Sequence, residues 1–184
     1  GQPLTGSEAH RLMRWVHGDP TPVAPDPLAA RWDLALLYGV RQGEALGLTW
    51  DCVDLTEHTL DLSWQLQRFT WRHGCAPAPQ PATCGGRRGA DCPRRTLSIP
   101  AKYEHRVLDG GLVLSRPKGE KRRMVPMLPI LEASLRQRMV DAAFQPNPHG
   151  LVFARPNGMP VSPSADSAAW DQHLRDAGLP DVRL

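Results

Sequence analysis

The hydrophobic pattern changes its period along the first part of the chain, and this change limits the folds available. Between residues 27 and 39 the apolar side chains recur at helical spacing, whereas residues 59–66 (TLDLSWQL) alternate polar with apolar. A period near 3.6 buries one face of a helix, and a period of two buries one face of a strand. The sequence therefore predicts an α+β domain that is mainly helical with a small antiparallel sheet.

Capping residues and turn signals place the other elements. Thr5 and Glu8 fit a capping box for a helix over residues 7–17, and Asp26 and Pro27 can start the next helix, which should end at Gly39. Further helices are predicted over residues 42–48, 128–144 and 164–177, and strands over 112–115 and 123–126. Because a polar segment with a glycine separates these two strands, we expect them to pair as a hairpin.

The size of the chain favours a single domain. Its 184 residues, 41% of them hydrophobic, can bury one core. The longest apolar run, residues 34–38, is far shorter than the roughly 20 residues of a membrane-spanning helix. No signal-peptide pattern opens the sequence. We therefore expect a cytoplasmic location and no membrane partner.

Positive charge is concentrated in one region. Residues 72–123 contain 12 of the 22 Lys and Arg residues but only 4 of the 19 Asp and Glu residues, although the net charge of the chain is only +3. Such a region favours a polyanionic partner, because each neutralised phosphate releases counterions. The alternative is a solvated, disordered basic loop.

The segment 36–50 (LLYGVRQGEALGLTW) places Arg41 between two apolar runs, with Glu44 three residues later. A guanidinium packed among apolar residues is costly to bury unless a carboxylate or a phosphate meets it. Arg41 and Glu44 could therefore form an internal ion pair whose role is purely structural. Alternatively, Arg41 could bind an external anion. Lys118 lies in the predicted hairpin turn of the basic region and could reach the same anion, which favours the second interpretation.

Two stretches resemble the tyrosine recombinases, the family that includes the phage integrases. Residues 35–55 (ALLYGVRQGEALGLTWDCVDL) are similar to the first arginine box of that family, and residues 117–126 (PKGEKRRMVP) to its lysine hairpin and the following strand. The likeness covers most of the chain except residues 71 to about 110. It implies that residues 1–184 form part of a recombinase catalytic domain, with an insertion over residues 72–95.

The resemblance also implies an activity and its catalytic residues. The activity is site-specific DNA recombination or integration, in which strands are cleaved and rejoined through a 3′-phosphotyrosyl intermediate without a catalytic cofactor. By resemblance, Arg41 would clamp the scissile phosphate, Glu44 would orient this arginine, and Lys118 would protonate the leaving 5′ oxygen. The implied partners are double-stranded DNA and, in the full-length protein, further copies of the chain on the DNA.

The second box of the family and its tyrosine nucleophile are not found in this sequence. Tyr38 falls in a predicted core helix and Tyr103 precedes the predicted hairpin, so neither stands at the family's nucleophile position. These 184 residues are therefore expected to be catalytically incomplete on their own.

DNA contacts are expected from the basic region and the arginine box. The predicted DNA-binding residues are Arg41, Trp71, Arg72, Lys118, Lys121, Arg122 and Arg123. Trp71 could stack on a base. Arg122 and Arg123 could instead lie on the solvated face of the predicted hairpin.

The insertion over residues 72–95 is rich in proline and glycine and lacks apolar periodicity, so it cannot build its own core. It carries His73, Cys75, Cys84 and Cys92, enough for a tetrahedral structural zinc site, although the paired C-x-x-C spacing typical of zinc is missing. A reduced disordered loop and a disulfide are the alternatives. The alternative function is a non-catalytic, zinc-stabilised nucleic-acid-binding module in which Arg41 is structural.

Overall fold

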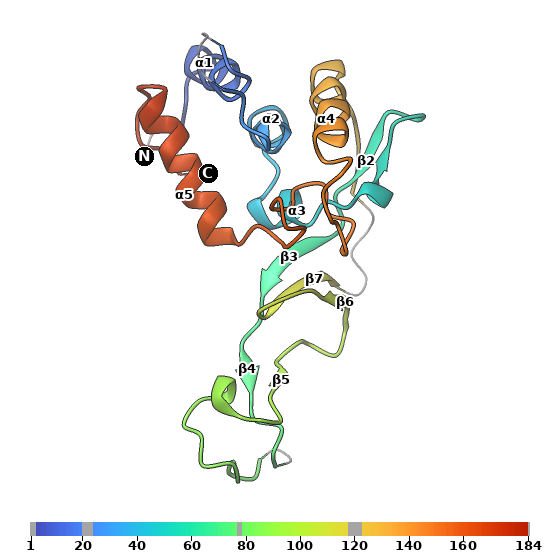
Figure 1. The fold of residues 1–184 in the computed structure, drawn as a ribbon, viewed down its shortest axis with the longest axis vertical. Coiled ribbons are helices and arrows are strands. Elements are labelled where there is room, and N and C mark those ends of the chain that lie inside the picture. Colours follow the sequence, from blue (N-terminus) through green and yellow to red (C-terminus); the bar gives the residue numbers. More distant parts are fainter. Residues whose placement is uncertain (1–2, 20–23, 77–78, 118–122, 184) are drawn as a thin grey trace.

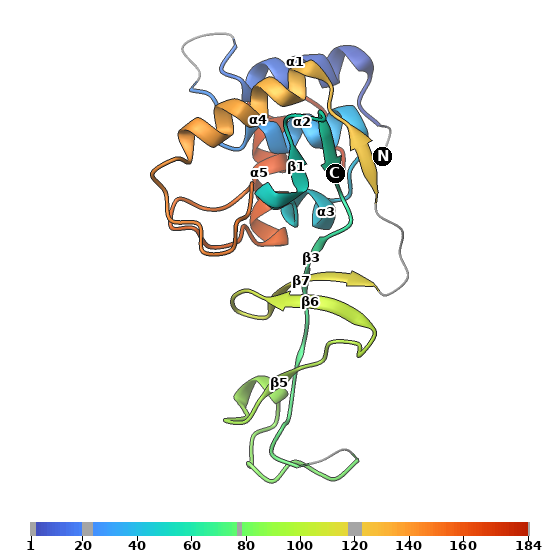
Figure 2. The same ribbon diagram turned by 90° about the vertical axis from the view of Figure 1, so that its right-hand side faces the viewer.

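The computed structural model describes residues 3–19, 24–76, 79–117 and 123–183, which form a helical body and a narrow β arm (Figures 1 and 2). The helices are α1 (Gly6–Val16), α2 (Ala29–Tyr38), α3 (Gln42–Leu46), α4 (Pro129–Asp141) and α5 (Pro163–Asp176). The strands are β1 (Val53–Asp54), β2 (Thr59–Asp61), β3 (Gln65–Arg68), β4 (Trp71–Arg72), β5 (Thr96–Leu97), β6 (Tyr103–Val107), β7 (Leu112–Pro117) and β8 (Met124–Pro126). The α+β prediction is confirmed.

Local capping interactions set the ends of the first two helices. The Thr5 hydroxyl accepts the Glu8 N–H and the Glu8 carboxylate accepts the Thr5 N–H, so the predicted capping box is present. Helix α2 begins two residues later than predicted, because the Asp26 carboxylate accepts the Leu28 N–H in the turn before it. It ends as predicted at Gly39, whose φ of 57° is the left-handed conformation that glycine adopts without strain.

The predicted strand over residues 59–66 is divided between two sheets. β2 lies in a sheet of order β1-β2-β8, and β3 in a sheet of order β3-β7-β6, all antiparallel. The Asp61 carboxylate accepts the Ser63 N–H, a local turn that ends β2 before β3 begins.

The prediction that residues 112–115 and 123–126 pair as a hairpin is wrong. β7 pairs on one edge with β3 and on the other with β6, so it has no free edge for β8, which pairs with β2 instead. The hairpin that forms is β6–β7, whose turn contains Gly110 and Gly111 with positive φ. The predicted lysine turn falls in residues 118–122, outside the described residues.

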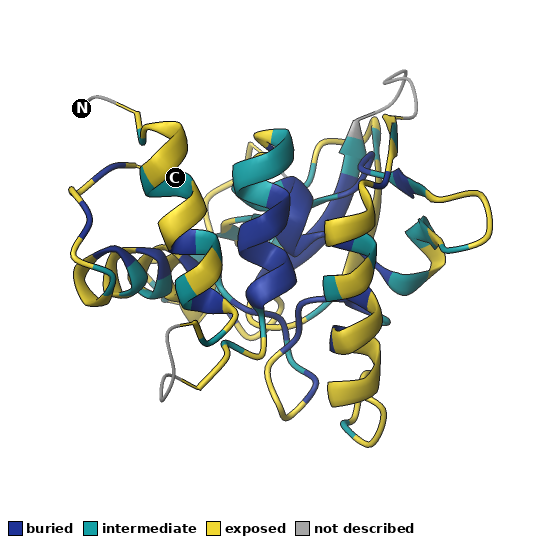
Figure 3. Ribbon diagram, turned by 90° about the horizontal axis from the view of Figure 1, so that it is seen from above, coloured by how far each residue is buried: buried dark blue, intermediate teal, exposed yellow. Residues whose placement is uncertain are grey.

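Helix α2 lies at the centre of the body and is held by buried charges as well as by apolar packing (Figure 3). Arg31 donates two hydrogen bonds to Asp166 of α5, at 3.0 and 2.9 Å. Asp33 accepts from the Ser134 hydroxyl of α4 and pairs with His17 at the end of α1. These pairs tie three helices to α2, because an unpaired charge in its buried face would be strongly destabilising.

The β arm leaves the body along β3 (Figure 1). α3 packs closely on β3, since a Cβ added at Gly47 would lie 2.8 Å from the Leu66 nitrogen. Beyond β3, the β4–β5 pair closes the loop of residues 73–95 at the far end of the arm. Among the described residues, no helix is both long and apolar enough to cross a membrane.

Candidate functional site

An open cleft of about 470 Å³ lies where α2, α3, β3 and β8 approach one another. Its lining residues are Gly39, Arg41, Glu44, Leu62, Ser63, Gln65 and Arg123. The cleft thus joins the arginine box to the start of β8. It brings together two of the three predicted catalytic residues, Arg41 and Glu44.

The Arg41 side chain points outward and is 80% exposed. The expectation that it packs among apolar residues is wrong. Gly39 turns the chain out of α2, and Arg41 takes an extended backbone conformation as the residue that precedes α3. Its guanidinium approaches Glu44 only to 3.9 Å, so it is available to an external anion.

Glu44 is the buried centre of the cleft, with a side chain only 5% exposed. Its carboxylate accepts the Arg41 backbone N–H at 3.1 Å and the Arg123 guanidinium at 2.6 Å. The closer side-chain partner of Glu44 is therefore Arg123 and not Arg41. A local pattern could not reveal this pair, because the two residues lie 79 positions apart in the sequence.

Arg123 is also fixed through its backbone. Its N–H donates to the Ser63 hydroxyl at 3.0 Å, and its carbonyl accepts the Leu62 N–H at 2.9 Å. The predicted site residues Lys118, Lys121 and Arg122 lie outside the described residues. This segment directly precedes Arg123 in the sequence, and Arg123 lines the cleft.

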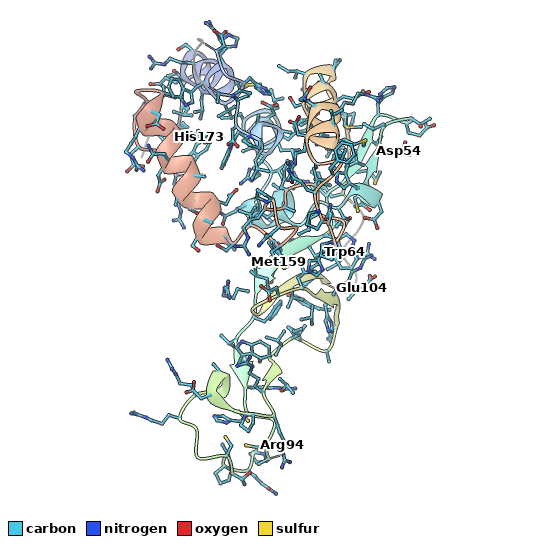
Figure 4. All side chains as sticks on the ribbon, viewed as in Figure 1. Asp54, Trp64, Arg94, Glu104, Met159 and His173 are labelled. Atoms are coloured by element: carbon cyan, nitrogen blue, oxygen red, sulfur yellow. The ribbon has the colours of Figure 1, made fainter. Side chains whose placement is uncertain are left out.

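Trp71 and Arg72, two predicted DNA-binding residues, lie on the arm and not in the cleft. The Arg95 guanidinium stacks over the Trp71 ring at 4.7 Å, and the Arg72 Nε donates to the Thr96 hydroxyl at 3.1 Å. Figure 4 shows Trp64 and Glu104 near the base of the arm and Arg94 toward its far end. The predicted DNA-binding residues that are described therefore occupy two separate places.

The four residues predicted to bind metal come together at the end of the arm. The nearest ligand atoms of His73, Cys75, Cys84 and Cys92 all lie within 4.8 Å of one another. A tetrahedral zinc ion with bonds of about 2.3 Å to sulfur separates its ligands by ~3.7 Å, so this donor set fits zinc with small adjustments. All four cysteines of the chain are described and all are free thiols.

The thiols of this cluster have unequal acidities. Burial opposes ionisation of Cys75, but hydrogen bonds from Thr83 outweigh it and lower the pKa of this thiol to about 6. The Gly86 N–H favours the Cys84 thiolate, yet burial and the neighbouring Cys75 raise the pKa of Cys84. A cation among them would remove the repulsion between neighbouring thiolates that this difference reflects.

The cleft thus contains a buried carboxylate flanked by two guanidiniums, one of which is turned to solvent. No family model matches the chain. An integrase from Saccharopolyspora erythraea is 30% identical over 178 residues, which cover 84% of this chain and 40% of that protein.

Three solved structures share the fold at low sequence identity. The XerA recombinase has a TM-score of 0.61 at 16% identity, over 100% of this chain and 45% of that chain. The Tn1549 transposon integrase in complex with circular intermediate DNA scores 0.63 at 16% identity, over 99% and 48%. The XerH recombinase bound to difH substrate scores 0.56 at 13% identity, over 100% and 38%.

The resemblance drawn from the two sequence boxes is thereby confirmed: the chain is similar to tyrosine recombinases and has the fold of part of their catalytic domain. It spans less than half the length of each of these relatives.

Proposed function

We propose that the chain is part of the catalytic domain of a tyrosine recombinase that cleaves and rejoins double-stranded DNA at specific sites, as in integration. The observation that supports this most is the exposed Arg41 guanidinium above the buried Glu44–Arg123 pair in an open cleft. The relatives include an integrase, a transposon integrase solved in complex with DNA, and a site-specific recombinase solved bound to its difH substrate. The proposed protein acts in the cytoplasm and assembles as several copies on its DNA.

In the proposed reaction Arg41 binds the scissile phosphate with its planar guanidinium and offsets the charge that develops as the phosphate is attacked. Arg123 has a different task. At 2.6 Å it neutralises Glu44, so the positive charge of Arg41 is left for the substrate. Glu44 in turn fixes the backbone from which Arg41 projects, through the N–H at 3.1 Å.

Lys118 is assigned the proton transfer to the leaving 5′ oxygen, as the resemblance implies. It precedes Arg123 by five residues, and the fixed backbone of Arg123 supports a placement near the cleft. Lys121 and Arg122 are assigned contacts to DNA phosphates beside it. The strand transfer proposed here uses no catalytic metal.

The nucleophile of this reaction is neither tyrosine of the chain. The Tyr38 hydroxyl donates to the Pro126 carbonyl at 2.9 Å and accepts the Leu128 N–H at 2.7 Å, which is a structural role. Tyr103 packs edge to face against Phe69 on the arm, with ring centroids 6.5 Å apart. Both tyrosines are among the described residues, and neither lines the cleft.

A nicked duplex that traps the covalent intermediate tests the proposal. The protein used contains this chain together with the second box and the tyrosine of the family. We expect it to form a protein–DNA adduct, and Arg41→Ala to reduce the rate by about 100-fold or more, because a preorganised charge at the phosphate is lost. Arg11→Ala, which removes an exposed arginine of α1, is the matched control. An adduct formed equally well by Arg41→Ala would contradict the assignment.

For the arm we propose a structural zinc ion bound by His73, Cys75, Cys84 and Cys92, which would fasten a loop that has no apolar core. Mass spectrometry of the native protein should find one zinc ion per chain. Cys84→Ser should lose it and Cys52→Ser should keep it, because Cys52 lies outside the cluster. A folded wild-type protein without zinc would contradict the proposal. The exposure of Arg41 argues against the alternative of a binding module in which this arginine is only structural.

A further inference from the structure

Two arginine pairs follow the cysteines at the end of the arm. Arg87 and Arg88 come after Cys84 and two glycines, and Arg94 and Arg95 come after Cys92 and one proline. Each pair is therefore attached by only a few residues to the cluster of metal-ligating side chains. Whatever fixes that cluster also fixes where the arginines project.

In each pair, the side chain of one arginine contacts other residues of the arm. The Arg88 Nε donates to Asp91 at 3.2 Å. Arg95 donates to the Ala90 carbonyl at 2.8 Å and stacks on Trp71. These two guanidiniums have intramolecular partners, and their contacts hold the turn that separates the two pairs.

The side chain of the other arginine in each pair has no such contact within the described residues. Arg87 and Arg94 are exposed, and within the described part of the chain neither guanidinium has a hydrogen bond or an ion pair. Residues 72–97 contain five arginines and one acidic residue, Asp91, which Arg88 already neutralises. The end of the arm therefore presents two free planar cations in a positive field, a combination suited to phosphate oxygens.

The arm also starts at the cleft. Gln65, the first residue of β3, lines the cleft, and the chain continues from β3 through β4 to the cluster (Figures 1 and 4). A duplex with one phosphate at Arg41 continues beyond the cleft, with a further phosphate about every 3.4 Å along each strand. Phosphates of the same duplex are thus available to an arm that extends from the cleft wall.

We propose that the end of the arm, organised by the His73, Cys75, Cys84 and Cys92 cluster, is a second DNA contact in which Arg87 and Arg94 bind backbone phosphates outside the Arg41 cleft. This inference rests on the proposed function, since it assumes that the partner is DNA. The contact is sequence-independent and adds affinity and orientation rather than catalysis.

Fluorescence anisotropy with a labelled duplex of about 40 base pairs tests this contact over a series of salt concentrations. The zinc-loaded chain is compared with the double variant Arg87→Ala/Arg94→Ala. We expect the variant to bind roughly tenfold or more weakly at about 0.1 M salt, and its salt-dependence slope to fall by about two, because two counterion-releasing contacts are lost. Zinc content and circular dichroism should stay unchanged, since both side chains are exposed.

The matched control removes the same charge elsewhere. Arg11→Ala/Arg175→Ala deletes two exposed arginines and should change the slope much less. Helix α1, which carries Arg11, lies at the end of the body remote from the arm (Figure 1), as does His173 of α5, two residues before Arg175 (Figure 4). Equal effects of the two double variants, or no effect of the arm variant on a chain that binds DNA, would overturn the second contact and leave the recombinase proposal intact. Failure of the unaltered chain to bind DNA would overturn the second contact as well. An adduct formed equally well by Arg41→Ala would contradict the assignment of the cleft alone, which keeps the two failures distinct.

Discussion

The Glu44 carboxylate joins two segments of the cleft that are far apart in the sequence. It accepts a backbone N–H from its own helix start and a guanidinium from Arg123, while its side chain is almost fully buried. A buried acid is stable in its charged form only when such partners are present. At the scale of single residues, the Glu44 carboxylate therefore both holds the two segments of the cleft together and balances the positive charge of Arg123.

We predict that Glu44→Gln lowers the free energy of unfolding by about 1–3 kcal/mol, because the hydrogen bond from the Arg123 guanidinium then meets a neutral amide. Urea denaturation followed by circular dichroism measures this loss. Glu57→Gln is the control, since Glu57 is exposed and should change stability by less than about 0.5 kcal/mol. Equal stability of the two variants would show that Glu44 does not hold the cleft together.

At the scale of elements, α2 is held by pairs that respond to pH. The hydrogen bond that the His17 imidazole donates to the Asp33 carboxylate raises the pKa of His17 above its ordinary value of 6.5, although burial opposes this shift. A raised pKa in the folded state means that the charged imidazolium stabilises the fold. This contribution is complete below about pH 6.5 and is lost as pH rises through the folded pKa.

We predict that His17→Gln removes this pH dependence. The difference in unfolding free energy between wild type and variant should be larger near pH 6 than near pH 8. Thermal or urea unfolding at both pH values measures it, and His10→Gln is the control because His10 is exposed on the same helix. The same difference at both pH values would mean that the His17–Asp33 pair contributes nothing through ionisation.

The helices could be predicted from the sequence much better than the pairing of the strands. Caps such as Thr5 and Gly39 act over a few residues, so a local pattern places helix ends within three positions, the largest difference being at the end of α4. β7 could pair with β3, β6 or β8 on local grounds, and only the assembled body decides between them. The Glu44–Arg123 and Arg31–Asp166 pairs are equally non-local, which is why the sequence gives the types of residue at the site but not all of their partners.

At the scale of the whole molecule, the body and the arm depend on different forces. The three apolar clusters of the body draw on no described residue between positions 67 and 107. The part of the arm beyond β3 therefore relies on its short strand pairs, its stacked arginine and the proposed zinc ion. Such a segment can open without unfolding the body.

We predict that removal of zinc by a chelator loosens the arm alone. Trypsin should then cleave several-fold faster at Arg87, Arg88, Arg94 or Arg95, while the melting temperature of the helical body changes by less than about 2 °C. Mass spectrometry of the fragments and a thermal scan measure the two effects. A cleavage rate that the chelator leaves unchanged would show that zinc does not hold the arm. A helical body whose melting temperature falls when the chelator is added would show that the two parts are not independent.

The proposed activity depends most on the cleft, in which Arg41 is exposed and Arg123 is paired with Glu44. A crystal structure of the chain bound to duplex DNA tests this most directly. We predict one backbone phosphate within about 3 Å of the Arg41 guanidinium, with the Lys118 amine turned toward the same phosphate and the Glu44–Arg123 pair intact. A duplex bound elsewhere, with the Arg41 and Lys118 side chains pointing to different sides of the molecule, would contradict the account.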